Sequence, residues 1–340
     1  MRSFLFKRFF LLFLTIFGVV IITFSLSRVL HGDPALLILG EHPTAEQLES
    51  VNEKLGLNKP LIEQFWIYIT DLARGDLGTS LRTKTPVSFE LKNRFTATFE
   101  LVTIALFLAI LIGFPLGVLS AYYRNTKLSL FIRTISFTSF ALPVFWSGML
   151  LQILLFGELG WFPLQGRISA QFQSSELSVK TGILVVDTLL TGNWEMFLDA
   201  VRHMALPVIC LSFSILGIII RTVRSAALEN IQQDYFMTYQ TFGFGPLIIL
   251  FRYALRNSLI LSVTVVGLVY GMLLGGSFLV ESIFDWPGLG HFGYLSISTS
   301  DLPSVMGVTI LYSAVYVMIN FLVDIACHYL DPRLRIGEVN

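Results

Sequence analysis

Long apolar stretches alternate with polar connections along most of the chain. Six of them approach or exceed the about 20 residues that a helix needs to cross about 30 Å of hydrocarbon. They cover residues 9–26, 101–122, 134–156, 204–220, 258–280 and 305–327. The fourth stretch is the shortest, so we expect its helix to extend into the flanking residues. The pattern predicts an all-α, polytopic membrane protein with six membrane-spanning helices.

The composition agrees with this pattern and excludes several classes of protein. Of the 340 residues, 54% are hydrophobic and 14% are charged, whereas a soluble domain has about a quarter of its residues charged. A net charge of zero gives no reason to expect a nucleic-acid partner. The two cysteines, Cys210 and Cys327, lie inside apolar stretches, so a disulfide framework is not indicated. This composition favours an environment of membrane lipid.

Two apolar segments need a separate interpretation. The first stretch follows a basic N-terminus, as in a secretory signal, but it exceeds the roughly 7–15 apolar residues of a signal core and lacks a clear A-x-A site. We therefore expect it to remain as an anchor. Residues 183–190 are too few to span a membrane and include Asp187. This segment is interpreted as a surface or re-entrant element.

Lysine and arginine residues indicate the orientation of the spans. They occur in the connections 123–133 and 221–257 and in the C-terminal tail, whereas residues 281–304 contain none. The positive-inside rule therefore places both termini in the cytoplasm and 281–304 outside. Residues 31–98 also carry basic side chains, but long external segments cross largely regardless of charge. Within them, residues 44–55 are typical of one short helix ending at Gly56.

These features divide the chain into four parts. Residues 1–30 are an N-terminal membrane helix, and residues 31–98 are an external insertion. Residues 99–328 are a core with five membrane helices and the cytoplasmic loop 221–257, and residues 329–340 are a cytoplasmic tail.

Glycine recurs on one face of the fifth predicted span. Gly267, Gly271 and Gly275 are four residues apart, and Gly276 follows directly. Small residues at this spacing let helix backbones approach closely inside a membrane, which predicts helix packing. A second interpretation, which the sequence leaves open, places this face along a translocation path.

Other small and proline residues also lie inside the predicted spans. A similar glycine pair lies in the second span, and three spans contain a proline, which we expect to produce ordinary packing kinks. These residues are Gly113, Gly117, Pro115, Pro143 and Pro207.

Candidate chemistry inside the spans is sparse. Asp324 is the only acid well within an apolar stretch, and it precedes His328 by one helical turn with Cys327 beside it. The three side chains do not share one helix face, so we expect a structural hydrogen bond and no metal site. The sequence contains no G-x-x-x-x-G-K-[ST], H-E-x-x-H or G-x-S-x-G motif. We therefore predict no catalytic residues, no cofactor and no ATP binding by this chain alone.

The loop 221–257 has the pattern of an amphipathic helix. Apolar side chains recur at steps of three and four residues before the glycines and proline that stop the helix. No lysine or arginine lies between 229 and 246, which favours a protein partner over a lipid surface. The stripe consists of Leu228, Ile231, Tyr235, Tyr239 and Phe242, and the stop consists of Gly243, Gly245 and Pro246.

Short motifs along almost the entire chain resemble one family. The sequence is similar to the membrane permeases of binding-protein-dependent ABC importers, specifically the B-type subunit of dipeptide and oligopeptide systems. In order, the motifs are HGDP at 31–34, LGL at 55–57, GDLGTS at 75–80, RFTATFEL at 94–101, PLG at 115–117, LPVFW at 142–146, HMALP at 203–207, ESIFDWPGLG at 281–290, DLP at 301–303 and DPRLR at 331–335.

The resemblance implies a fold, a function and partners. It implies the type I ABC importer permease fold in the inner (plasma) membrane and a path for peptides that works by alternating access. It also implies a second related permease, two ATPase subunits that hydrolyse ATP, and an external substrate-binding protein.

The resemblance also makes 234–245 the loop that couples the chain to the ATPase. Asp234, Tyr235, Thr238 and Gly243 match the family pattern there, and we add Tyr239 as a neighbour on the stripe. The chain departs from the pattern at Met237, Tyr239, Gln240, Thr241 and Phe242. Either the partner ATPase has a matching altered cleft, or coupling is weaker.

Other functions remain open at the level of sequence. The same architecture serves importers of nickel, glutathione or heme, since one fold hosts several cargoes. A passive channel subunit would need no coupling helix. An intramembrane hydrolase would need a Ser/Lys, paired Asp or metal set at matching depth, and the spans contain none.

Overall fold

The computed structural model describes residues 2–29, 44, 46, 49, 58–173, 181–249 and 255–330. Within these ranges the chain is mainly helical and forms no β-strand; one isolated bridge pairs Thr79 with Pro86. The prediction of an all-α fold is therefore confirmed. The motifs at 31–34, 55–57 and 331–335 and most of the predicted helix 44–55 lie outside the described residues.

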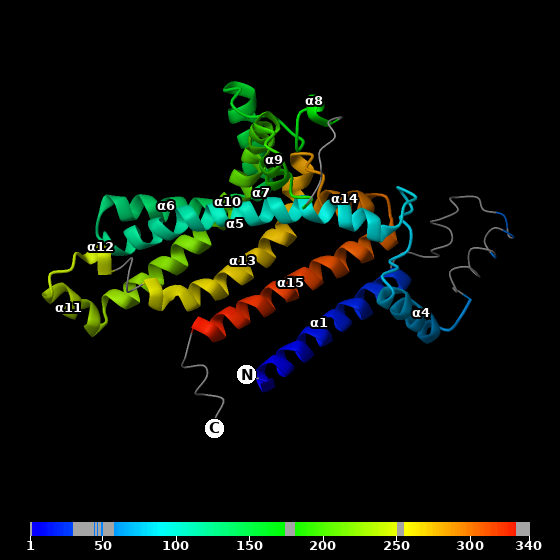
Figure 1. Cartoon of the computed structure of the whole chain (residues 1–340), viewed down its shortest axis with the longest axis horizontal. Helices are drawn as coiled ribbons and strands as arrows, with labels where there is room; N and C mark the ends of the chain where they lie inside the picture. The colour runs from blue at the N-terminus through cyan, green and yellow to red at the C-terminus, as the bar shows by residue number, and fades with distance from the viewer. Residues whose placement is uncertain are drawn as a thin grey trace. The chain divides into compact units, whose positions relative to one another are not determined.

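Five of the described helices are long and apolar enough to cross a membrane. They contain the first, second, fourth, fifth and sixth predicted spans (Figure 1). With 36 and 38 residues, the second and third of these helices are nearly twice as long as the about 20 residues of a span, so both extend beyond the hydrocarbon. The five are α1 (Arg2–Val29), α5 (Val87–Tyr122), α10 (Trp194–Ile231), α13 (Leu255–Ile283) and α15 (Leu302–Leu330).

The third predicted span is bent much more sharply than the ordinary proline kink that the sequence predicted there. Residues 134–156 fall on α6 (Lys127–Ala141) and on α7 (Val144–Leu151), which continues as the π-helix η1 (Gln152–Glu158). The two parts meet at an angle of 106°. Pro143 lacks an N–H and forces the preceding Leu142 into an extended conformation, with φ −83° and ψ 128°. Pro143 therefore breaks the helix, and counting the bent pair as one span gives six.

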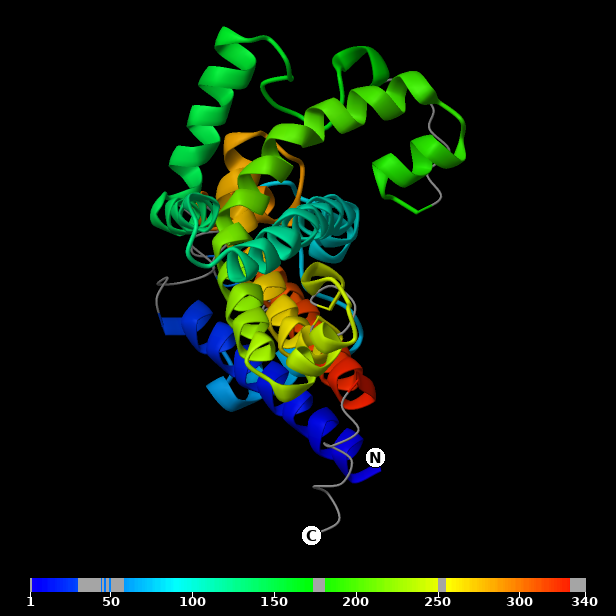
Figure 2. The same cartoon turned by 90° about the vertical axis from the view of Figure 1, so that its left-hand side faces the viewer.

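The described residues fall into two compact units, one within residues 96–290 and 318–330, the other within residues 2–95 and 291–317. In the first unit, α10 is the central helix and packs against α13, α6, α7 and α9 (Leu184–Leu190). Of the residues in its most apolar stretch, 72% are buried. The helix changes direction along its length in Figure 2, and Pro207 lies inside it.

Small residues bring neighbouring helices close to α10. A Cβ atom on Gly113 or Gly117 of α5 would lie within 2.9 Å of Ile219 and within 2.7 Å of Val223, respectively. A Cβ atom on Gly217 would overlap the carbonyl of Ser136 on α6. The Ser136 hydroxyl also donates a hydrogen bond to the Gly217 carbonyl at 2.9 Å. Backbone contact of this kind is the packing expected where no hydrophobic effect drives helices together.

In the second unit, α1 packs against α4 (Leu61–Ala73). The Phe24 ring lies 5.2 Å from the Phe65 ring and 5.8 Å from the Tyr68 ring.

At the start of α15, the buried Asp301 carboxylate accepts hydrogen bonds from the Leu81 amide at 2.9 Å and the Ser304 hydroxyl at 2.8 Å. The turn that follows the GDLGTS motif is thereby fixed to α15. The remaining helices are α8 (Ala170–Gln173), α11 (Asp234–Thr241), α12 (Pro246–Ile249) and α14 (Leu289–Ser298).

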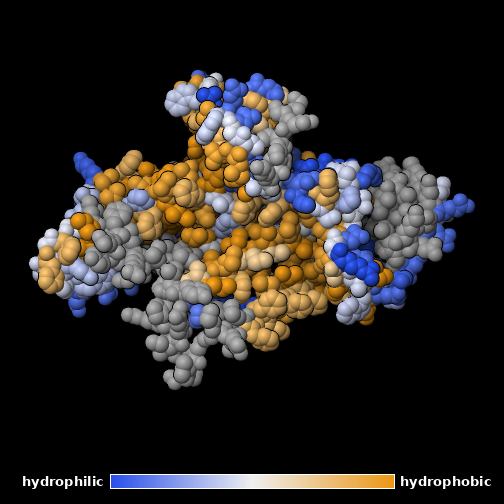
Figure 3. Space-filling view, in the orientation of Figure 1, coloured by the Kyte–Doolittle hydropathy of each residue, from blue (hydrophilic) through white to orange (hydrophobic). Residues whose placement is uncertain are grey.

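Large hydrophobic side chains cover much of the surface of the long helices. Phe9 and Phe13 of α1 and Phe131, Phe137 and Phe140 of α6 are all exposed. Figure 3 shows this apolar surface as extended orange areas. Monomeric soluble proteins rarely expose apolar patches of this extent, so these faces suit contact with lipid or with other membrane helices.

Candidate functional site

The candidate coupling segment is interrupted where the sequence predicted a continuous helix. The stripe from Leu228 to Phe242 was expected on one helix, but α10 ends at Ile231 and α11 begins only at Asp234. Gln233 between them is extended, with ψ 146°. An acid in the first turn of a helix is favourable for the helix dipole, so Asp234 favours a new start at this point.

Tyr235 braces the turn between the two helices. Its hydroxyl donates to the Asn230 side-chain oxygen at 2.6 Å, across the break. The Tyr235 ring lies 6.4 Å from the Tyr239 ring, and Tyr239 lies 5.8 Å from Phe244 in edge-to-face geometry. Both tyrosines are half-buried in their own segment. They therefore hold the shape of the segment as well as lying on its predicted stripe.

The end of α11 has the geometry that the glycine stop requires. Gly243 has φ +83°, the left-handed conformation that favours glycine, and its amide donates to the Gln240 carbonyl at 2.9 Å. Thr238 is exposed and its hydroxyl donates back to the Asp234 carbonyl at 3.0 Å. Substitution of Gly243 would strain the backbone without a collision, because no described atom lies within 4 Å of a Cβ atom there.

Two large apolar side chains of this segment are largely accessible at the surface. Met237 is 71% exposed and Phe242 is 75% exposed, whereas Phe236 is buried and anchors α11. The sequence placed Phe242 on the predicted apolar stripe but gave Met237 no place there, because the stripe was followed through an unbroken helix. The signal was nevertheless present, since both positions depart from the family pattern toward larger apolar residues.

The glycine row on α13 has two different environments. Gly267 is buried, and a Cβ atom there would lie 2.8 Å from the Val323 side chain of α15. Gly271 is half-buried, and no described atom lies within 4 Å of a Cβ atom on Gly275 or Gly276. The row therefore runs from close packing within this chain to open space, and helix packing and a translocation path both stay predictions.

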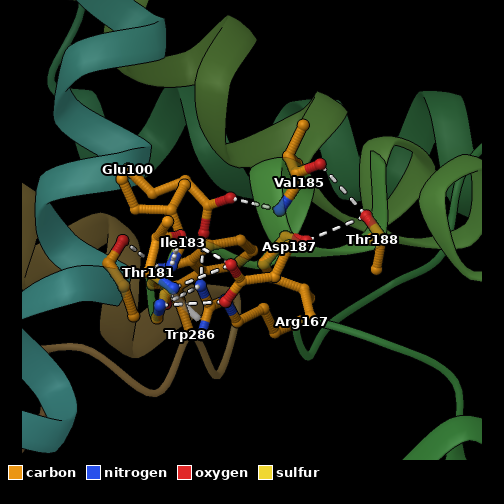
Figure 4. A network of polar contacts seen from close by, with 11 residues as sticks. Glu100, Arg167, Thr181, Ile183, Val185, Asp187, Thr188 and Trp286 are labelled. Carbon is orange, nitrogen blue, oxygen red and sulfur yellow. Dashed lines mark hydrogen bonds and ion pairs between the residues drawn. The ribbon is translucent and has the colours of Figure 1, made fainter. Parts of the chain in front are cut away.

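A buried ion pair connects α5 to the segment before α8. The Glu100 carboxylate of α5, only 2% exposed as a residue, pairs with the Arg167 guanidinium and accepts a hydrogen bond from the Val185 amide at 2.8 Å. The Arg167 guanidinium also lies 5.7 Å from the centre of the Trp286 ring (Figure 4). Four segments that are distant in sequence thus meet around one charge pair.

The ESIFDWPGLG and RFTATFEL motifs lie against each other. Trp286 is fully buried and its indole N–H donates to the Ala97 carbonyl at 3.0 Å. The Thr98 hydroxyl donates to the buried Glu281 carboxylate at 2.7 Å and accepts from the Leu289 amide at 2.8 Å. A Cβ atom on Gly288 would overlap both the Glu281 carboxylate and the Thr98 hydroxyl. These contacts explain why both motifs combine small, polar and aromatic residues.

The short apolar segment that contains Asp187 forms α9. The Asp187 carboxylate is 2% exposed and accepts hydrogen bonds from the Thr181 amide at 2.8 Å, the Thr181 hydroxyl at 2.7 Å and the Gly182 amide at 2.9 Å. This acid therefore closes the turn that leads into α9 and places the Val185 amide against Glu100.

The carboxylates described above accept hydrogen bonds from fixed donors, so the network holds segments of the chain in position. Within the described ranges, no group of three or more His, Cys, Asp or Glu side chains could hold a metal ion. Near the end of α15, His328 is buried, and the Cys327 sulfur lies 3.4 Å from the Thr264 hydroxyl of α13.

Comparison with known proteins places these features in a family context. Residues 113–336 match the family described as "Binding-protein-dependent transport system inner membrane component", and residues 1–102 match its N-terminal domain. Similar proteins include the "Probable D,D-dipeptide transport system permease protein" of Escherichia coli K12, 42% identical over 96% of this chain and 95% of that protein.

Two further relatives match over nearly their full lengths. The di/tripeptide transport system permease protein of Pseudomonas aeruginosa is 39% identical over 98% of this chain and 99% of its own length. The glutathione transport system permease protein of Pectobacterium atrosepticum is 33% identical over the same shares.

Proposed function

Because the chain belongs to the family of inner membrane components of binding-protein-dependent transport systems, we propose that it forms the translocation path of an ATP-driven importer of short peptides. It is a membrane subunit of a transporter and not itself an enzyme. The observation that carries the peptide assignment is the match over nearly the full chain to permeases of dipeptide and di/tripeptide systems. The bundle of apolar helices and the exposed helix α11 support the role as a membrane subunit of an importer.

The proposed complex contains four further subunits. They are a second related permease, two ATPase subunits that hydrolyse ATP, and an external substrate-binding protein. The family description supports the binding protein. The absence of a phosphate-binding motif from the sequence supports separate ATPase subunits. The open side of α13 at Gly275 and Gly276 supports a contact or path formed with the second permease.

The proposed coupling runs through two connected helices, α11 and α10. α11 carries the exposed Met237 and Phe242, and the Tyr235–Asn230 hydrogen bond ties it to α10. α10 in turn packs against α13, α6 and α7. Movement of a docked ATPase is therefore transmitted to the membrane spans through this hydrogen bond and the packing of α10, as alternating access requires. Asp234, Thr238, Tyr239 and Gly243 shape the same docking segment.

Uptake by the complete transporter tests this proposal. The five subunits, reconstituted into vesicles with the ATPase domains accessible to added ATP, should accumulate a labelled dipeptide only with both ATP and loaded binding protein. Glutathione, nickel and heme serve as competing substrates, and preference for one of them would replace the peptide assignment. Equal dipeptide flux without ATP would instead identify a passive channel, and ATP hydrolysis by this chain alone would contradict the division of labour.

The proposed orientation places both termini and α11 in the cytoplasm. Single cysteines introduced into 285–300 should react with a membrane-impermeant reagent in intact cells, and those introduced into 232–245 should react only after the membrane is opened. The physical reason is the distribution of lysine and arginine between the connections. The reverse labelling pattern would overturn the orientation.

A further inference from the structure

A cavity outside the coupling segment lies within the unit formed by Arg2–Phe95 and His291–Val317. It has a volume of about 220 Å³ and is bounded by the end of α1, by α4, by residues 76–81 and by the start of α15. The walls are mainly apolar, with Phe24 and Met306 among the lining residues. The cavity is smaller than the about 300–1,000 Å³ of a drug-sized ligand site, so it suits a compact group attached to a longer molecule.

The surrounding elements place this cavity at the edge of the membrane. Arg28, which lines it, is the last residue of the apolar span Arg8–Arg28. Beside it, α4 exposes Leu61, Ile62 and Trp66 to the surroundings. Tryptophan is enriched at membrane–water interfaces, and a helix with an exposed apolar face of this kind lies in the headgroup region. The cavity is therefore at the depth of lipid headgroups.

Two hydrogen-bond donors in this cavity have no acceptor in the part of the chain that the structure describes. The Arg28 Nε atom and the Tyr68 hydroxyl are buried and donate no hydrogen bond to the described residues. The nearby Thr23 hydroxyl donates instead to the Val19 and Val20 carbonyls of its own helix. Burial raises the pKa of Tyr68 to about 12, so its phenol keeps the proton and can donate it. Buried donors without an acceptor are costly, which points to an acceptor supplied from outside the described residues.

The charged groups of the cavity define that ligand further. Arg28 supplies one positive charge, and Asp71 and Asp76 line the same space with two carboxylates. The Asp76 carboxylate accepts a hydrogen bond from the Gly78 amide at 2.8 Å, which fixes its position. A ligand that carries both a phosphate and an ammonium group complements this arrangement. An anionic phospholipid would leave both carboxylates without a counter-charge, and a choline headgroup lacks N–H donors for them.

We propose that this cavity binds the headgroup of phosphatidylethanolamine. The phosphate lies against the Arg28 guanidinium and the Tyr68 hydroxyl, and the ammonium group lies against Asp71 and Asp76. The acyl chains follow the exposed apolar sides of α1 and α4. In the proposed orientation of the spans, the lipid belongs to the outer leaflet.

Native mass spectrometry of the purified full chain tests this site. The chain is exchanged into an equimolar mixture of phosphatidylethanolamine, phosphatidylcholine and phosphatidylglycerol, and retained lipids are counted. The unaltered chain should keep one molecule of phosphatidylethanolamine in preference to the others. Arg28→Gln should reduce this retention about tenfold, because a hydrogen bond to a charged group is lost. Arg74→Gln is the matched control, since Arg74 is exposed near the same helix and does not line the cavity.

A second variant keeps the test decisive if Arg28→Gln does not fold. Replacing both acids, Asp71→Asn with Asp76→Asn, should shift the preference from phosphatidylethanolamine toward phosphatidylglycerol, a change of specificity that misfolding does not produce. Equal retention of the three lipids by the unaltered chain would overturn the proposal. Displacement of the lipid by a dipeptide would overturn it as well and assign the cavity to the transported substrate.

Discussion

We expect Arg167→Met to destabilise the folded chain by about 3–5 kcal/mol, the cost of leaving a buried charge without its partner. The Glu100 side chain is fully buried, and without the guanidinium its carboxylate would keep the Val185 amide as a donor. The loss would affect α5, the segment before α8 and Trp286, because Arg167 belongs to that segment and contacts both Glu100 of α5 and Trp286. Chemical unfolding of the purified chain in detergent measures the change.

The exposed pair Lys59–Glu63 is the matched control. Its side chains are 47% and 53% exposed, so Lys59→Met should cost at most about 1 kcal/mol. Adding Glu100→Gln to the Arg167→Met variant should recover part of the lost stability, because the penalty comes mainly from the unpaired carboxylate. Equal effects of Arg167→Met and Lys59→Met would show that water reaches Glu100 and that the network does not hold these segments together.

The membrane helices were predictable from sequence because the bilayer sets their minimum length. Five of six apolar stretches lie on long helices, and the α5 and α10 helices extend beyond them into polar residues. The sharp bend in the stretch 134–156 was not predicted, because hydropathy carries no information on the direction of a helix. The signal for its bend was the dipeptide Leu142–Pro143, whose backbone restriction acts on the residue before the proline. An apolar stretch with a central proline permits a kinked span or a sharp bend.

The polar contacts were not predictable, because they join residues far apart in the chain. Thr98 and Glu281 are separated by 183 residues, and neither position alone indicates its partner. The motifs that contain them were recognised as patterns, whereas their contact with each other required the fold. The glycine row shows the same limit, since Gly267 and Gly275 have the same spacing and residue type but meet Val323 and open space, respectively.

The sequence predicted the position of the candidate coupling segment, but it predicted only part of its exposed apolar face, namely Phe242 and not Met237. The periodic stripe assumed that residues 228–242 form one helix, whereas the chain turns at Gln232 and Gln233. After the turn, the side chains of Met237 and Phe242 are exposed, and Tyr235 is engaged with Asn230. A break of two residues therefore changes which side chains face a partner.

This geometry predicts that Met237→Ser with Phe242→Ser abolishes most peptide uptake. Both side chains are largely exposed, so their loss should leave the fold of the chain intact. In an interface, truncation of a buried apolar anchor costs about 2 kcal/mol or more, so docking of the ATPase should weaken at least about 30-fold. The measurements are co-purification of the ATPase with this chain and stimulation of ATP hydrolysis by loaded binding protein.

Two further variants separate docking from the shape of the segment. Gln240→Ser changes an exposed polar residue of the same helix and should leave uptake near normal. Tyr235→Phe keeps the ring but removes the hydrogen bond to Asn230, worth about 0.5–1.5 kcal/mol, so it should reduce coupling while the ATPase still co-purifies. If the double serine variant instead transports normally with full stimulation, α11 rests against lipid through Met237 and Phe242, and the ATPase must engage another part of the chain.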